Sequence, residues 1–114
     1  HGGVAQGIGA ALFEEMLYNE DGQLVSASLV DYVIPSAVEI PMMDVVHIES
    51  ESAVTGGFRG MGEGGTIGAP AAIANAIADA LSPLGINVST LPVTPQRLFT
   101  LLEQARTRKE GNHE

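Results

Sequence analysis

The chain has no cysteine and no tryptophan, and it has few basic residues. Without cysteine, it cannot hold a disulfide, a cysteine-ligated zinc ion or an iron–sulfur cluster of its own. With 14 acidic residues and 5 basic ones, its formal net charge is −9. Nucleic acids and anionic membrane surfaces are therefore disfavoured as partners, because their phosphate groups repel a chain of the same charge.

Long apolar runs and bulky aromatic side chains are also scarce. No run approaches the roughly 20 residues of a membrane span, and no signal peptide is recognisable, so we expect a cytoplasmic protein with no membrane partner. The 114 residues allow one domain. Apolar residues make up 45% of the chain but aromatic residues only 4%. Small aliphatic side chains favour close backbone packing over large pockets.

The hydrophobic spacing predicts three helices. Apolar residues recur at helical intervals over residues 4–18, 70–81 and 95–105. Pro70 suits the first turn of a helix, where its missing N–H needs no partner, and Thr94 is a favourable N-cap directly before a proline.

Two further segments indicate strands. Residues 24–35 are rich in apolar and β-branched side chains, and residues 45–49 form a second short run of this kind. The stretch 82–92 is expected to contribute one short strand or none. We therefore expect an α+β fold, with about three helices packed on a small mixed or antiparallel sheet. Residues 107–114 would form a polar tail.

One acidic residue, Glu63, stands among four glycines in the stretch Gly60-Met61-Gly62-Glu63-Gly64-Gly65. Glycines leave the backbone free to adopt positive φ and let a bulky partner approach closely. A carboxylate presented in this way indicates a site. By composition alone, a solvated side chain on a flexible turn is an equally good interpretation.

The same loop matches the Gly-x-Gly-x-x-Gly spacing of dinucleotide-binding proteins. No hydrophobic strand directly precedes it, however, and Glu63 would place a negative charge among the phosphates. The phosphate-binding lysine of the P-loop class is absent. The histidines at positions 1, 47 and 113 are too dispersed to predict a cluster of metal ligands, so we expect no metal bound directly by this chain.

Two separated motifs, in this order, suggest a family. Residues 2–12 (GGVAQGIGAAL) and residues 57–70 (GFRGMGEGGTIGAP), followed by the alanine-rich stretch 71–81, resemble the C-terminal part of the molybdenum-binding large subunit of the xanthine dehydrogenase, aldehyde oxidase and carbon monoxide dehydrogenase superfamily. On this resemblance, residues 1–106 would be a C-terminal portion of a molybdenum cofactor-binding domain.

The resemblance implies a role for several residues. Glu63 would be the general base beside the molybdenum, and Gln6 would lie against the pterin of a molybdopterin-type cofactor, in its cytosine dinucleotide form or another. Gly7, Gly62 and Gly64 would let that cofactor approach closely. A carboxylate whose pKa is raised by partial burial suits such a base.

Large subunits of this family are several times longer than 114 residues, and the sequence begins inside the first glycine motif. We expect a fragment or a split-off subunit that is inactive alone. Its partners would be the remainder of the molybdenum-binding subunit and the subunits that hold iron–sulfur clusters and FAD, and exposed apolar surface would favour a homo-oligomer. The alternatives are a non-catalytic structural module of the same family and, less favoured, a dinucleotide-binding protein. Aldehydes, N-heterocycles and carbon monoxide all fit as substrates.

Overall fold

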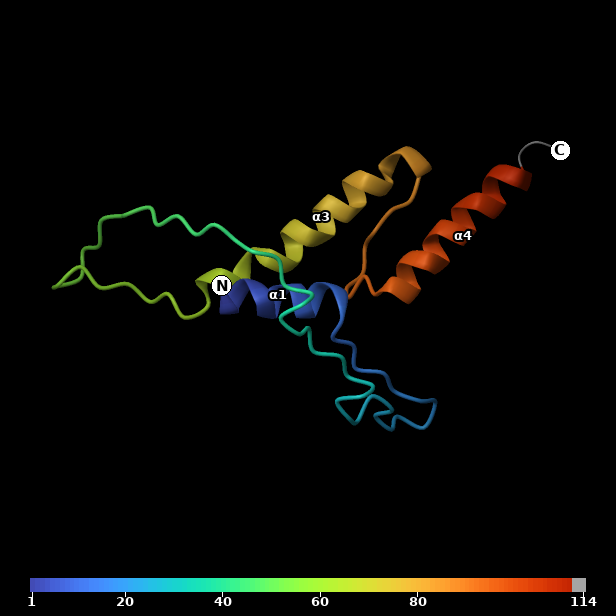
Figure 1. Cartoon of the computed structure of the whole chain (residues 1–114), viewed down its shortest axis with the longest axis horizontal. Coiled ribbons are helices and arrows are strands. Elements are labelled where there is room, and N and C mark those ends of the chain that lie inside the picture. The colour runs from blue at the N-terminus through green and yellow to red at the C-terminus, as the bar shows by residue number, and fades with distance from the viewer. Residues whose placement is uncertain (112–114) are drawn as a thin grey trace.

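The computed structural model describes residues 1–111, which form an elongated arrangement of helices and long loops (Figure 1). The helices are α1 (Gly2–Leu12), α2 (Gly64–Ile67), α3 (Ala69–Leu81), the short 3-10 helix η1 (Ser82–Leu84) and α4 (Pro95–Gly111). The radius of gyration is 18.8 Å, whereas a compact domain of 100 residues has one of about 13 Å. The chain is therefore far more extended than a self-contained domain of its length.

The first helix packs against α2 and α3 through small residues. Gly7 is buried at the contact with α3, where a Cβ atom added to it would lie 2.5 Å from the Cβ of Ala69. Only glycine allows this approach without a shift of one helix. The helix ends at Leu12, before the predicted limit at residue 18, because the backbone turns away from helical geometry at Phe13, which has a φ of −128°.

The two later helices begin where the sequence predicts. Pro70 lies in the first turn of α3, and the Thr94 hydroxyl accepts a hydrogen bond from the Arg97 N–H at 3.2 Å and so caps α4. Helix α4 extends to Gly111, so residues 107–111 are helical, and residues 112–114, with the third histidine, lie outside the described part. A small core joins α3 to α4; its buried members are Leu81, Ile86 and Ala105.

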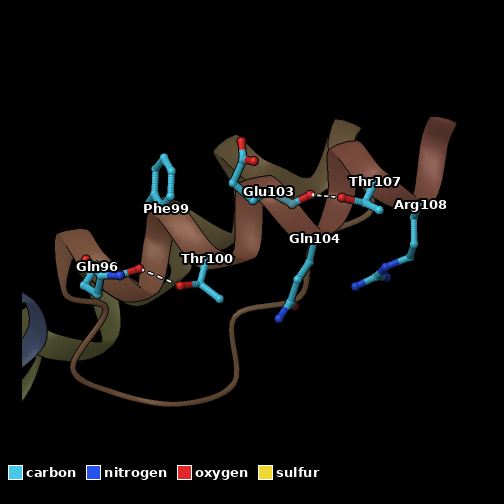
Figure 2. A pocket seen from close by; sticks show the side chains of 7 residues that line it. All are labelled: Gln96, Phe99, Thr100, Glu103, Gln104, Thr107 and Arg108. Atoms are coloured by element: carbon cyan, nitrogen blue, oxygen red, sulfur yellow. Dashed lines mark hydrogen bonds between the residues drawn. The ribbon is translucent and has the colours of Figure 1, made fainter.

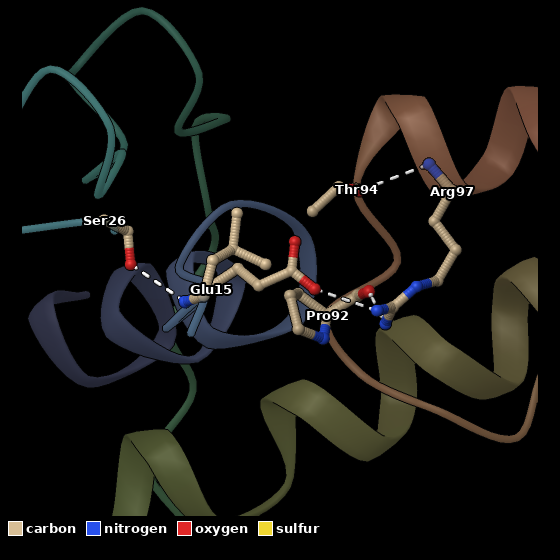
Figure 3. A network of polar contacts seen from close by, with 6 residues as sticks. Glu15, Ser26, Pro92, Thr94 and Arg97 are labelled. Atoms are coloured by element: carbon tan, nitrogen blue, oxygen red, sulfur yellow. Dashed lines mark hydrogen bonds and ion pairs between the residues drawn. The ribbon is translucent and has the colours of Figure 1, made fainter. Parts of the chain in front are cut away.

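Hydrogen bonds and an ion pair join the beginning of α4 to the end of α1 and the residues just after it (Figure 3). The Arg97 guanidinium donates one hydrogen bond to the Pro92 carbonyl oxygen at 2.6 Å and another to the Glu15 carboxylate at 2.8 Å. Just before α4, the Val93 N–H donates to the Ala11 carbonyl oxygen at 2.7 Å. Ala11 and Val93 are both buried, at 0% and 3% exposure. These contacts determine how α4 is placed relative to α1.

The predicted sheet is not present in residues 1–111. Segments 24–35 and 45–49 form no strand, and the β-type pairing there is limited to an isolated antiparallel bridge between Tyr18 and Leu24. A strand is stabilised by a ladder of hydrogen bonds to a neighbouring strand, and no part of the described chain supplies such a ladder to either segment. Residues 82–92 contain no strand either. The expected α+β layering is thus replaced by helices and loops.

One helical stretch of the described chain, Gly64–Leu84, is long and apolar enough to pass a simple test for a membrane span. From the sequence we expected none. The stretch consists largely of alanine and other small residues, and Gly68 interrupts it between α2 and α3. Neither helix alone reaches the roughly 20 residues that a span requires. A single stretch of this kind is weak evidence for a membrane location.

Candidate functional site

The two glycine-rich motifs of the sequence meet in the structure. A Cβ atom on Gly3 of α1 would lie only 2.9 Å from the Cα of Gly65 in α2, so the two backbones touch directly. The Thr66 hydroxyl donates to the Gly3 carbonyl oxygen at 2.9 Å and lies 3.4 Å from Oε1 of Gln6. Residues about 60 positions apart in the sequence therefore form one contact at the N-terminal end of α1.

Glu63 is the residue just before α2, and it belongs to this contact through its backbone. Its carbonyl oxygen accepts a hydrogen bond from the Thr66 N–H at 2.9 Å. Its side chain is exposed, and within residues 1–111 the carboxylate takes part in no ion pair. The carboxylate is therefore accessible to a group from outside the described chain. Partial burial, which the role of a base calls for, has to come from such a group.

Two glycines that precede Glu63, Gly60 and Gly62, have open space around them. A Cβ atom on Gly60 or Gly62 would meet nothing within 4 Å, and neither residue has a positive φ. At Gly64 such an atom would meet only the flexible side chain of Met61. Contacts and backbone geometry within residues 1–111 thus give no reason for glycine at positions 60 and 62. The bare backbone fits the close approach of an external group, as a pterin cofactor would require.

Gly7 is placed differently from the other predicted cofactor contacts. It is buried, and the space where its side chain would be is filled by Ala69 and Pro70 of α3. Packing between helices is therefore a sufficient reason for glycine at this position. A contact between Gly7 and a cofactor remains a prediction.

Two titratable groups outside the glycine motifs have shifted pKa values. The Tyr32 hydroxyl donates a hydrogen bond to the Glu14 carboxylate, which raises the pKa of Tyr32 above its usual range. Hydrogen bonds from the hydroxyl and N–H of Ser36 lower the pKa of Glu39. Neither pair was singled out from the sequence. Both pairs are local contacts of the loop after α1.

A surface pocket of about 660 Å³ lies on α4 and is lined by residues of that helix alone, from Gln96 to Arg108 (Figure 2). Its threonine hydroxyls are already used within the helix: Thr100 donates to the Gln96 carbonyl oxygen and Thr107 to that of Glu103. None of the site residues predicted from the sequence lines it. Nor does the described chain bring together three or more side chains that could ligate a metal ion.

Comparisons with known proteins show the family of this chain. Residues 1–41 match the family model of the molybdopterin cofactor-binding domain. The chain is 47% identical over 98 residues to the nicotine 6-hydroxylase large subunit of Paenarthrobacter nicotinovorans, which covers 85% of this chain and 12% of that protein. It is 38% identical over 101 residues to the xanthine dehydrogenase molybdenum-binding subunit of Escherichia coli O157:H7, and this match covers 87% of the present chain and 13% of that protein. The chain belongs to the molybdenum-binding large-subunit family of the xanthine dehydrogenase superfamily.

The structural comparison agrees with this assignment. The crystal structure of quinoline 2-oxidoreductase from Pseudomonas putida 86 superimposes with a TM-score of 0.85 and 45% sequence identity, over 90% of this chain and 13% of that one. The chain thus spans 12% to 13% of the length of these family members. The family model includes Gln6 and Gly7, whereas Glu63 lies outside the matched residues.

Proposed function

We propose that this chain is a segment of a molybdenum hydroxylase, an oxidoreductase, and that it contributes Glu63 as the general base and Gln6 as a contact to the cofactor. The observation that supports this best is the direct contact of the two glycine motifs at Gly3 and Gly65. Gln6 lies beside Thr66, three residues after Glu63, and the backbone at Gly60 and Gly62 is open. The match to the molybdopterin cofactor-binding domain and the similarity to a molybdenum-binding subunit support the cofactor class, a molybdopterin bound to molybdenum.

Thr66 lies beside Gln6 in this proposal. The Thr66 hydroxyl donates its one hydrogen to the Gly3 carbonyl oxygen at 2.9 Å, and the Gln6 side-chain amide lies 3.4 Å from the same hydroxyl. The amide carries two N–H donors and an acceptor oxygen. Gln6 would thus offer hydrogen-bonding groups to the cofactor, and Glu63 would accept a proton from the reacting group. When bound, the cofactor supplies the oxidising metal centre.

The remaining parts of the enzyme would come from other polypeptide. A chain without cysteine cannot bind iron–sulfur clusters through thiolates, so electrons would leave through partner subunits that hold iron–sulfur clusters and FAD. The remainder of the large subunit would complete the cofactor site, and the isolated chain would not turn over substrate. The substrate, and whether the cofactor has the cytosine dinucleotide form, depend on residues outside this segment.

The role of Glu63 is tested by Glu63→Gln in the complete large subunit, assembled with its partners. Loss of a general base lowers the turnover number by about 10²–10⁴-fold, while the molybdenum content measured by elemental analysis should not change. Glu20→Gln is the matched control, because Glu20 is also an exposed glutamate and lies in the turn after α1. The control enzyme should turn over like the wild type.

Three outcomes separate the proposal from its alternatives. Turnover close to wild type in the Glu63→Gln enzyme would support a purely structural role of the glycine loops. Loss of molybdenum together with activity would assign Glu63 to retention of the cofactor. Gln6→Ala tests the second residue, and a normal molybdenum content with normal turnover would contradict its contact with the cofactor.

A further inference from the structure

Residues 41–63 leave the helices as a long excursion and return to them (Figure 1). The excursion reverses at Val54–Gly57, where the Gly57 N–H donates to the Val54 carbonyl oxygen at 2.9 Å and two glycines have positive φ. One hydrogen bond, from the Ser52 hydroxyl to the Phe58 carbonyl oxygen, joins its two sides. The returning side ends at Glu63. The position of this carboxylate therefore depends on the contact between α1 and α2 on one side and on what holds the excursion in place on the other.

On the outgoing side of the excursion, residues 44–51, the four residues 46–49 alternate between apolar and polar side chains as in a half-buried strand, and Val45 adds an apolar side chain on the face of His47. Val46 and Ile48 point to the same face of an extended chain, since successive side chains alternate between faces. They are 84% and 90% exposed. His47 and Glu49 belong to the opposite face, which is polar at these positions. An alternation of this kind is typical of a strand that covers a core with one side.

The backbone of this segment lacks the pairing that the pattern requires. Within residues 1–111, no hydrogen bond engages an N–H or C=O group of residues 44–51; the nearest bond is the one from His1 to the carbonyl oxygen of Met43. An extended segment with unpaired backbone groups and exposed β-branched side chains has the properties of an unpaired strand edge. Such an edge pairs readily with another strand.

The remainder of the large subunit is the partner that fits this edge. The fold matches a protein of which it represents only 13%, with a TM-score of 0.85 over 90% of this chain, so most of the surroundings of the segment lie in other polypeptide. A second copy of this chain fits poorly, because each copy has a net charge of −9. Antiparallel pairing about residues 46 and 47 would also set Asp44 opposite Glu49, and like charges in that position are destabilising.

We propose that residues 44–51 add as a β-strand to a sheet edge of the remaining large subunit, with Val46 and Ile48 against its core. This proposal rests on the proposed function only in taking the chain as a segment of such a subunit. Strand addition would fix the outgoing side of the excursion and, through the turn at Val54–Gly57, the returning side that ends at Glu63. Residues 44–51 would then both bind the rest of the large subunit and help to position Glu63.

Hydrogen exchange in the complete large subunit, resolved to single residues by mass spectrometry, tests this pairing. A strand at a sheet edge donates with alternate N–H groups. Alternate amides of residues 44–51 should therefore exchange at least about 100-fold more slowly than free amides. Fast exchange throughout the segment would overturn the proposal. Protection that disappears on dilution of the enzyme would also overturn it, since the partner would then be a second copy.

Substitutions on the two faces provide the matched comparison. Val46→Lys should abolish the protection of residues 44–51, whereas His47→Lys, on the opposite face, should retain it. The exchange protection of peptides from α4 reports whether the variant remains folded. If the α4 peptides of Val46→Lys lose their protection, the milder change Val46→Thr is used in its place. Unchanged protection in a folded Val46 variant would refute the buried face. Exchange is measured without turnover, so the outcome is independent of the test of Glu63.

Discussion

Replacing Gly7 by alanine tests the close packing of α1 against α3. The added Cβ atom would lie 2.5 Å from the Cβ of Ala69 and 3.1 Å from the Cδ of Pro70. Carbon atoms pack at about 3.5–4.0 Å, so the helices would have to separate by about 1 Å. Such overpacking costs about 1–3 kcal/mol, and alanine recovers about 0.5–1 kcal/mol in a helix interior. We expect the free energy of unfolding to fall by about 1–2 kcal/mol.

Urea unfolding of the chain, monitored by circular dichroism, measures this change in the free energy of unfolding. Two further variants show whether the change comes from the contact between the helices. Gly2→Ala in the same helix is the matched control, because nothing lies within 4 Å of a Cβ atom there. It should leave the stability unchanged or raise it slightly. Ala69→Gly removes the opposing carbon atom. In the double variant of Gly7 and Ala69, part of the loss should be recovered, with a coupling energy of about 1 kcal/mol.

The explanation by packing fails if Gly7→Ala is neutral or stabilising. It also fails if the loss is the same with Ala69 present and with Ala69→Gly, because the cost would then not come from the contact between the two helices. Either result would leave the predicted contact between Gly7 and a cofactor as the better reason for a glycine at this position.

Two further changes test contacts of Arg97, in the first turn of α4, and of the loop that follows α1. Arg97→Gln removes the ion pair with Glu15 and the hydrogen bond to the Pro92 carbonyl oxygen. Because the side chains of the ion pair are partly exposed, we expect the free energy of unfolding to fall by only about 1 kcal/mol. Unchanged urea unfolding would contradict this. The hydrogen bond to Glu14 raises the pKa of Tyr32 in the folded chain above its pKa in the unfolded chain. This hydrogen bond therefore contributes fully to stability at pH values below the unfolded pKa, and the contribution is lost as the pH rises through the folded pKa. An ultraviolet titration of the Tyr18→Phe chain should show late ionisation of Tyr32, and Glu14→Ala should return it to the ordinary range; no difference between the two chains would refute the effect.

The helices could be predicted from the sequence because their signals are local. The cap at Thr94 and the proline at position 70 act within one turn of the chain, and both helices begin there. The strands could not be predicted in the same way. Alternation in residues 45–49 shows which face is apolar, but a strand also needs a partner, and no residue pattern within this segment indicates whether the partner belongs to the same chain.

The candidate site was predicted only in part. The motifs led to Glu63 and Gln6 as predicted site residues, and their roles stay predictions. The motifs gave no sign that Gly3 and Gly65 touch or that Thr66 lies next to the Gln6 amide. Contacts between segments about 60 residues apart depend on how helices pack, and packing of small residues leaves little trace in composition.

The bonds between α1 and the start of α4 also have a consequence for how motion spreads through the chain. The Val93 N–H is tied to the last turn of α1 at Ala11, and the opposite end of the same helix touches Thr66 through Gly3. A helix of 11 residues transmits a tilt from one end to the other as a rigid rod. A partner that displaces the start of α4 would thereby also move Gly65 and Thr66, the residues that follow Glu63.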